Sequence, residues 1–274
     1  MSSEHSLEGK FPRRVDINPT AICNLHCPWC YGPEPSLGAP LTTDQWLGAM
    51  NYLVRNGTQE FTFNGGEPLM RKDIDILLKH AKELGTRVTL STNGILIPKH
   101  IEAIRNYVDD IGIPIDGSTS EINSRSRVGI KNHFDIALSM IGYVREVKPE
   151  IDITVRTVVS KLNYFDIENI GKVIEDKSID RWKVAQMFLP NWDQIEYWDR
   201  LKVSHEFDNA TEDLRQKFPK LNIDIQSIAQ QLKGYVFVWP NADTISIYGN
   251  GPNIVNDQSE NTREQLSLMG RFQK

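Results

Sequence analysis

The stretch Arg14-Val-Asp-Ile-Asn-Pro-Thr-Ala-Ile-Cys23-Asn-Leu-His-Cys27-Pro-Trp-Cys30 joins a β-rich segment to a short loop that contains all three cysteines of the chain. Three thiols cannot pair off as disulfides, and their clustering in one loop is typical of a metal site. The alternative is a chance cluster of inert thiols, which behave as small apolar side chains. The spacing predicts a metal-binding loop directly after a strand.

Two kinds of metal centre are compatible with this loop. Iron–sulfur clusters are held by thiolates, and a four-iron cluster needs four ligands, so three cysteines leave one iron open to a small molecule. The alternative is a zinc site in which His26 supplies the fourth ligand. Because His26 and Cys27 are adjacent, they rarely reach one tetrahedral ion together, and zinc sites usually take ligand pairs from two separate segments. The loop therefore favours an iron–sulfur cluster.

Along the chain, short β-rich runs alternate with helical stretches. The predicted strands are Arg14–Pro19, Glu60–Asn64, Arg87–Ser91, Asp110–Ile115, Ile151–Val159 and Trp182–Phe188, and the predicted helices are Thr43–Asn56, Arg71–Leu84, Lys99–Tyr107, His133–Val147 and Asp166–Asp176. This alternation indicates right-handed βαβ units and a parallel sheet. About six units are too few for a closed eight-stranded barrel. The expected fold class is α/β, an open partial (β/α)6 TIM-like barrel.

The chain changes character after this series. We expect residues 1–190 to form the barrel core and residues 191–274 to form a short α+β extension that caps the barrel and its substrate side. In the extension, the pattern predicts helices at about His205–Phe218 and Ile225–Lys233. A small hairpin is predicted from Tyr235–Trp239 and Thr244–Tyr248.

Composition excludes several classes of protein. The chain has 31 basic and 36 acidic residues, a formal charge of −5, so no basic excess points to nucleic acid or an acidic membrane. Apolar runs such as Ile111–Ile115 are far too short to span a bilayer. Residues 1–10 are polar and do not resemble a signal peptide. The expected location is the cytoplasm, where disulfides are not favoured.

Four short motifs follow the first four predicted strands in order. They are Cys23-x3-Cys27-x2-Cys30 with Trp29 before the last cysteine, Gly65-Gly66-Glu67-Pro68, Ser91-Thr92-Asn93-Gly94 and Ile115-Asp116-Gly117. Together they resemble the radical S-adenosylmethionine (SAM) superfamily over about residues 11–190. The resemblance implies a [4Fe–4S] cluster on Cys23, Cys27 and Cys30, with SAM chelating the open iron through its amino and carboxylate groups.

The same resemblance implies that the Gly65–Pro68 motif binds the methionine part of SAM. Gly65 and Gly66 have no Cβ, so their backbone can approach the ligand closely. Glu67 would accept a hydrogen bond from the same region of SAM, its amino group. The alternative for this motif is a plain turn before the next helix.

The remaining SAM contacts implied by the resemblance lie at other strand ends. Ser91 and Asn93 would contact the ribose, because ligands of open α/β sheets gather at the carboxyl ends of the strands. Trp29 would lie beside the adenine, or else is a partly buried loop aromatic. Arg156 would meet the SAM carboxylate with its bidentate fork, or else is a surface arginine.

The implied reaction is reductive cleavage of SAM. A flavodoxin- or ferredoxin-type donor reduces the cluster, and SAM is cleaved to methionine and a 5′-deoxyadenosyl radical that abstracts a substrate hydrogen in a water-excluding barrel. No cysteine lies outside the loop, which argues against an auxiliary cluster and against a cysteine hydrogen donor. Rearrangement, elimination, decarboxylation or cyclisation remain, and a tyrosine could still donate hydrogen.

The substrate is less well defined by the sequence. The stretch Arg181–Gln186 resembles that of viperin-like and other nucleotide- or small-molecule-modifying members, and Lys183 and Gln186 are candidates to point into the barrel; a solvated face is the alternative. Trp192, Asp193, Tyr248 and Asn250 are candidates for the substrate mouth. A small polar metabolite (a nucleotide, nucleoside or sugar, as in natural-product biosynthesis) is the first choice. A ribosomally made peptide is second. A zinc-stabilised binding protein, or a fold that binds SAM without cleaving it, would also be compatible with the sequence.

Overall fold

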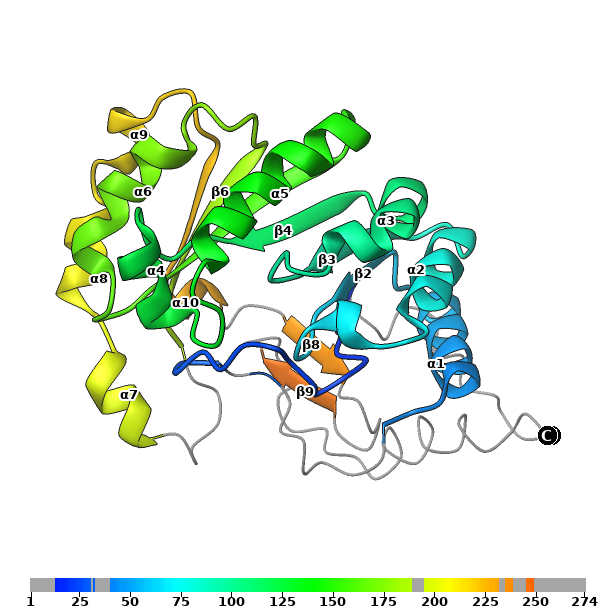
Figure 1. Cartoon of the computed structure of the whole chain (residues 1–274). Coiled ribbons are helices and arrows are strands. Elements are labelled where there is room, and N and C mark those ends of the chain that lie inside the picture. Colours follow the sequence, from blue (N-terminus) through cyan, green and yellow to red (C-terminus); the bar gives the residue numbers. More distant parts are fainter. Residues whose placement is uncertain are drawn as a thin grey trace.

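The computed structural model describes residues 13–30, 32, 40–188, 195–231, 235–238 and 245–248, with side chains described up to residue 231 and, after 188, only from 198. Its centre is one sheet with the strand order β7-β6-β5-β4-β3-β2-β1-β8-β9 (Figure 1). The strands are β1 Arg14–Ile17, β2 Glu60–Phe63, β3 Arg87–Ser91, β4 Asp110–Pro114, β5 Asp152–Val159, β6 Arg181–Gln186, β7 Ile223–Gln226, β8 Tyr235–Val238 and β9 Ile245–Tyr248. Neighbours from β7 through β8 pair in parallel, and β8 pairs with β9 antiparallel.

Helices connect successive strands and lie around the outside of the sheet (Figure 1). They are α1 Thr43–Arg55, η1 Pro68–Met70, α2 Ile74–Glu83, η2 Ile97–His100, α3 Ile101–Tyr107, α4 Ser120–Ser126, α5 His133–Val147, η3 Tyr164–Asp166, α6 Ile167–Ile174, α7 Ile195–Leu201, α8 His205–Thr211, α9 Leu214–Lys217 and α10 Ile228–Gln231. Local sequence explains the start of α1: the Thr42 hydroxyl accepts from the Gln45 amide, and the Gln45 side chain accepts from the Thr42 amide. This capping box satisfies two otherwise unpaired amides.

The strands alternate between an apolar face and a polar face. The apolar side chains are fully buried against the helices, as for Phe61, Ile111 and Val155. Trp182 on β6 lies on this outer face, where its ring meets the edge of Phe218. Each large side chain buried in this way contributes about 1.5–3 kcal/mol. The polar face consequently lies inside the half-barrel that the curled sheet forms.

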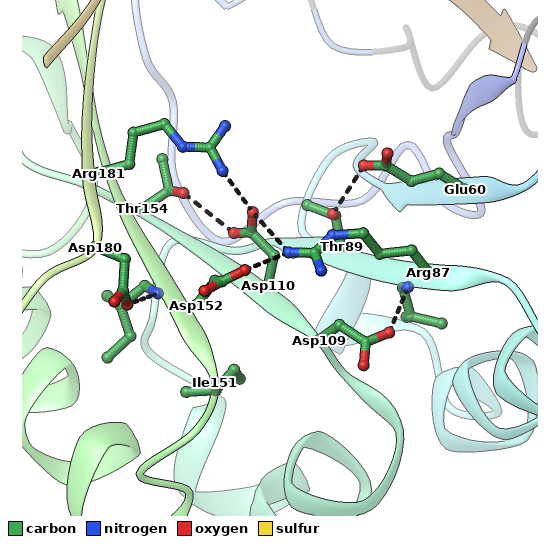
Figure 2. Close-up of polar contacts among 12 residues, drawn as sticks. Glu60, Arg87, Thr89, Asp109, Asp110, Ile151, Asp152, Thr154, Asp180 and Arg181 are labelled. Atoms are coloured by element: carbon green, nitrogen blue, oxygen red, sulfur yellow. Dashed lines mark hydrogen bonds and ion pairs between the residues drawn. The ribbon is translucent and has the colours of Figure 1, made fainter. Parts of the chain in front are cut away.

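At the amino-terminal end of the strands, a charged network fills this inner face (Figure 2). Asp110 accepts from Thr154 Oγ1 at 3.1 Å and from Arg181 Nη2 at 3.3 Å. The Arg87 guanidinium lies 3.8 Å from Asp110 and also pairs with Asp152. The network ties four strands together at one end of the half-barrel, which leaves their carboxyl ends for the functional site.

The expected partial barrel is confirmed, and the sheet continues beyond its six predicted strands at both edges. Ile223–Gln226 adds a seventh parallel strand beside β6, where the sequence predicts the start of a helix; only the shorter α10 follows it. The predicted hairpin is present, and β8 joins the sheet beside β1. The sheet therefore contains strands from both sides of residue 190, while the division into a core and a capping extension remains a prediction.

Candidate active site

The cysteine loop follows β1 at the carboxyl end of the sheet. Cys23 and Cys27 are half-buried and Cys30 is exposed, and all three are free thiols. Backbone amides point at two of the sulfurs: Leu25 N lies 3.4 Å from Cys23 Sγ, and Gly32 N lies 3.3 Å from Cys30 Sγ. Amide donors of this kind stabilise the negative charge that thiolate ligands bring to an iron–sulfur cluster. The loop thus fits a cluster at its three sulfurs.

Two of the thiols, Cys23 and Cys27, have raised pKa values that favour their protonated form. Burial raises the pKa of Cys23 to about 11, and the charges of Glu67, Cys30 and Cys27 raise it further. Burial also raises the pKa of Cys27, against the nearby Arg127 charge. Metal binding must therefore displace protons from the loop. Within the described part of the chain, no three His, Cys, Asp or Glu side chains converge on one point that could hold a single ion.

The two glycines of the Gly65–Pro68 motif let this loop pack against the cysteine loop. Gly66 N donates to Thr20 O and Glu67 N donates to Ile22 O, both at 2.8 Å. A Cβ on Gly66 would lie 2.3 Å from Ile22 O. Gly65 has a φ of +114°, and a Cβ there would lie 2.5 Å from Thr20 O. Only glycine allows the two loops to approach this closely. The expected contact between this backbone and SAM remains a prediction.

Glu67 joins the loops that follow β2 and β3. Its carboxylate is buried and accepts from Leu69 N at 3.1 Å, Thr92 Oγ1 at 2.7 Å and Asn93 N at 2.7 Å. Burial raises the pKa of Glu67 to about 7, although all three hydrogen bonds favour the ionised form. Glu67 therefore acts as a brace between two of the predicted SAM-binding motifs, while its bond to the SAM amino group remains a prediction.

Asn93 is held from three sides. Its Nδ2 donates to Asn24 Oδ1 in the cysteine loop at 2.6 Å. Its carbonyl oxygen lies 3.0 Å from His133 Nε2, while His133 Nδ1 lies 3.1 Å from Asn123 Nδ2. Burial lowers the pKa of His133 to about 4, and the Arg127 charge lowers it further. The network assigns a neutral imidazole that donates through Nε2 and accepts at Nδ1.

The structure brings Ser91 and Arg156 together. Arg156 Nη1 donates to Ser91 Oγ at 2.8 Å, although β4 separates their strands. Gly112 on β4 makes this possible, because a Cβ there would lie 2.2 Å from Arg156 Nε. Arg156 is half-buried on the inner face, so the surface alternative is wrong for it.

Sequence reasoning missed Arg127, which contacts the cysteine loop from the end of α4. Its Nη1 lies 3.6 Å from Cys27 Sγ, and its guanidinium carbon lies 4.7 Å from the centre of the Trp29 ring. Its Nε pairs with the buried Asp116 carboxylate. No short motif marks a lone arginine after a helix, so only the fold reveals it. Trp29 itself is buried, and its predicted adenine contact is not tested by this packing.

The substrate candidates separate in the structure. Lys183 pairs in register with Arg156 on one side and Asp224 on the other, so it shares the inner face. Gln186 lies three positions after Lys183 on β6, so its side chain is on the opposite, outer face of the sheet. There it donates to Val203 O at 2.6 Å and accepts from Ile228 N at 3.0 Å. Trp192, Asp193, Asn250 and the Tyr248 side chain lie outside the described residues.

Comparison with known proteins defines the class of this chain. The family model described as the radical SAM superfamily matches residues 17–174, more than half of the chain. The chain belongs to this superfamily, whose members use a [4Fe–4S] cluster and SAM. Among the described residues, no helix has the length and apolar character needed to cross a bilayer.

Particular relatives have several activities. The chain is 33% identical over 168 residues (60% of this chain, 41% of the relative) to Fe-coproporphyrin III synthase of Methanosarcina barkeri. It is 29% identical over 187 residues (66% and 48%) to PqqA peptide cyclase of Bradyrhizobium diazoefficiens. It is 28% identical over 237 residues (80% and 47%) to S-adenosylmethionine-dependent nucleotide dehydratase of Lacinutrix mariniflava. The chain thus spans less than half the length of these relatives.

A solved structure supports the fold. The structure of Streptococcus suis SuiB bound to its precursor peptide SuiA matches 79% of this chain and 49% of that chain, with a TM-score of 0.66 and 22% identity. A second structure of SuiB contains SAM. At this identity the likeness concerns the half-barrel alone.

Proposed function

We propose that this chain is a radical SAM enzyme whose substrate is a small polar metabolite with an anionic group, of the nucleotide class. The observation that carries the proposal is the pairing of Arg156 and Lys183 on the inner face of the half-barrel. Like charges directly opposite one another on adjacent strands repel. Asp224, in register with Lys183 on its other side, offsets part of this repulsion. An anionic ligand beside Arg156 and Lys183 would pair with both cations, so we expect substrates with phosphate or carboxylate groups.

The two cations follow the amino-terminal charged network along the inner face, since Arg156 lies two residues after Thr154 and Lys183 lies two residues after Arg181. Both charges act on the buried Asp16 carboxylate of β1, across the half-barrel, where they oppose the rise of its pKa on burial. Arg156 already contacts Ser91 and is assigned to the SAM carboxylate, as the resemblance implies. Lys183, one strand further on, is then placed for the anionic group of the substrate.

When bound, the cluster and SAM supply a 5′-deoxyadenosyl radical that takes a hydrogen atom from the substrate. The residues of this chain position the reactants. Cys23, Cys27 and Cys30 would hold the cluster, and the loops braced by Glu67 would hold SAM. A flavodoxin- or ferredoxin-type donor and a cytoplasmic location remain part of the proposal. The reaction that follows hydrogen abstraction is proposed as rearrangement, elimination, decarboxylation or cyclisation.

A second candidate is maturation of a ribosomally made peptide. Similarity to PqqA peptide cyclase over 66% of this chain favours it. The nucleotide dehydratase matches a longer part of the chain, 80%. The order of the two proposals follows from this difference and from the inner-face cations.

The experiment that separates them measures substrate-dependent formation of 5′-deoxyadenosine. Reconstituted protein is supplied with dithionite and SAM, and then with nucleoside triphosphates, nucleosides, sugar phosphates or candidate precursor peptides, each also in deuterated form. We expect a nucleotide to stimulate formation and to transfer deuterium, and Lys183→Met to raise the KM for it without changing SAM affinity. Stimulation by a peptide alone, unaffected by Lys183→Met, would support the second candidate instead.

A further inference from the structure

The segment directly after α4 packs on the cysteine loop. His26 N donates to Val128 O at 2.8 Å. Gly129 has a φ of +125°, and a Cβ there would lie 3.1 Å from Asn24 O. These contacts fix the backbone on one side of Arg127 against the loop that carries the predicted cluster ligands.

The Arg127 side chain is held in place by three different groups. Nε pairs with Asp116, Nη1 donates to Cys27 Sγ at 3.6 Å, and the guanidinium lies over the Trp29 ring at 4.7 Å. Asp116 is in turn fixed, because its Oδ1 accepts from Val158 N at 2.8 Å. The Arg127 side chain is 13% exposed and that of Asp116 is fully buried. A planar guanidinium can pair with a carboxylate, donate to a sulfur and stack on an aromatic ring at the same time, whereas the compact ammonium group of lysine cannot.

The charge and the hydrogen bond of Arg127 would affect the reduction potential of a cluster bound at Cys27. Reduction by one electron, from the 2+ to the 1+ state, makes a [4Fe–4S] cluster more negative. A positive charge and a hydrogen bond at a ligand sulfur stabilise the reduced form more than the oxidised form, so they raise the reduction potential. Because Arg127 is buried, water screens its charge weakly.

We propose that Arg127 is a positioning residue that raises the reduction potential of the cluster by donating a hydrogen bond to the Cys27 sulfur, with Asp116 holding its guanidinium in place. The proposal requires Cys27 to be a cluster ligand, as the family pattern implies, but it is independent of the substrate. An external one-electron donor supplies the electron, and no proton is transferred.

The test is a redox titration of reconstituted protein with dithionite, in which electron paramagnetic resonance follows the reduced cluster, with and without SAM. Arg127→Met removes the charge and the donor. Arg125→Met is the matched control, because Arg125 lies two residues earlier, is 43% exposed and pairs with Glu121 instead. We expect reduction of Arg127→Met to become about tenfold less favourable, which corresponds to a decrease of about 59 mV for a one-electron couple, while Arg125→Met stays at the wild-type potential.

Arg127→Lys keeps the charge and one donor, so its potential should lie between those of wild type and Arg127→Met. If Arg127→Met does not load a full cluster, Arg127→Gln, which keeps an amide donor without the charge, replaces it and should also show a lowered potential. A fully loaded Arg127→Met or Arg127→Gln protein with the wild-type potential overturns the proposal.

Discussion

Arg156 on β5 reaches over Gly112 on β4 and donates a 2.8 Å hydrogen bond to Ser91 on β3. Three neighbouring strands thus cooperate to place one guanidinium at the carboxyl end of the sheet. Gly112, on the middle strand, has no side chain and so leaves room for the Arg156 side chain to pass over it. This relationship links two predicted SAM contacts through a residue that no motif marks.

Gly112→Ala tests this arrangement. The added methyl group would lie 2.2 Å from Arg156 Nε, so the guanidinium must move away from Ser91. The displaced guanidinium would lose its predicted contact with the SAM carboxylate. Loss of one charge-assisted contact of this kind costs about 1.5 kcal/mol, so we expect equilibrium binding to show an SAM affinity about tenfold lower. Gly142→Ala in α5 is the control, because its Cβ meets nothing within 4 Å. Wild-type SAM affinity in Gly112→Ala would argue against a role of Arg156 in SAM binding.

Gly66→Ala is expected to abolish cluster assembly. A methyl group 2.3 Å from Ile22 O forces the cysteine loop away from the loop after β2, which separates Cys23 from its neighbours. Iron and sulfide content after anaerobic reconstitution provides the measurement, again with Gly142→Ala as the control. A full complement of iron in Gly66→Ala would show that the contact between these two loops is not needed to present the thiols.

Glu67→Ala removes the acceptor of three buried donors. Each donor left without a partner costs about 1–3 kcal/mol, so the variant should unfold at lower denaturant concentration. We also expect weaker SAM binding, because Asn93 N loses its anchor, while the cluster stays on its cysteines. Urea unfolding, SAM binding and the visible absorbance of the cluster are measured together. Unchanged SAM affinity in Glu67→Ala would count against the role assigned to this residue.

The lowered pKa of His133 predicts that the free energy of unfolding depends on pH. Its pKa is about 4 in the folded chain and about 6.5 in the unfolded chain, so on acidification the unfolded state binds the proton first. Above about pH 6.5 both states are neutral and the contribution is constant; stability is then lost as the pH falls through 6.5 towards 4, by about 3 kcal/mol in all. Urea unfolding of metal-free protein at several pH values should show this slope reduced in His133→Gln.

Gly142→Ala, which neither adds nor removes a titratable group and whose Cβ meets nothing within 4 Å, is the control for that comparison and should keep the wild-type slope. Equal slopes for wild type and His133→Gln would mean that the buried imidazole does not stay neutral.

The sequence identifies the parts of this site that depend on local patterns. The cysteine spacing, the strand alternation and the Gly65–Pro68 motif are each visible within a few residues. Arg127, His133 and Gly112 are not, because their roles depend on contacts between residues far apart in the chain: Arg127 meets a sulfur 100 positions away.

The seventh strand shows a similar limit in the fold. Ile223–Gln226 alternates over only four residues, too few to distinguish a strand from the start of a helix. The open edge of β6, which exists only in the folded sheet, decides the outcome. The prediction for Gln186 is wrong for a simpler reason, since three steps along a strand always reverse the face.

The defining property proposed for this chain is reductive cleavage of SAM at a cluster held by Cys23, Cys27 and Cys30. The most direct measurement is anaerobic reconstitution with iron and sulfide, followed by dithionite and SAM, with 5′-deoxyadenosine quantified for wild type and Cys27→Ala. We expect a brown wild-type protein that releases 5′-deoxyadenosine, and a Cys27→Ala protein with neither the cluster nor the product. A colourless wild-type protein that binds about one zinc ion and releases no 5′-deoxyadenosine would contradict this assignment.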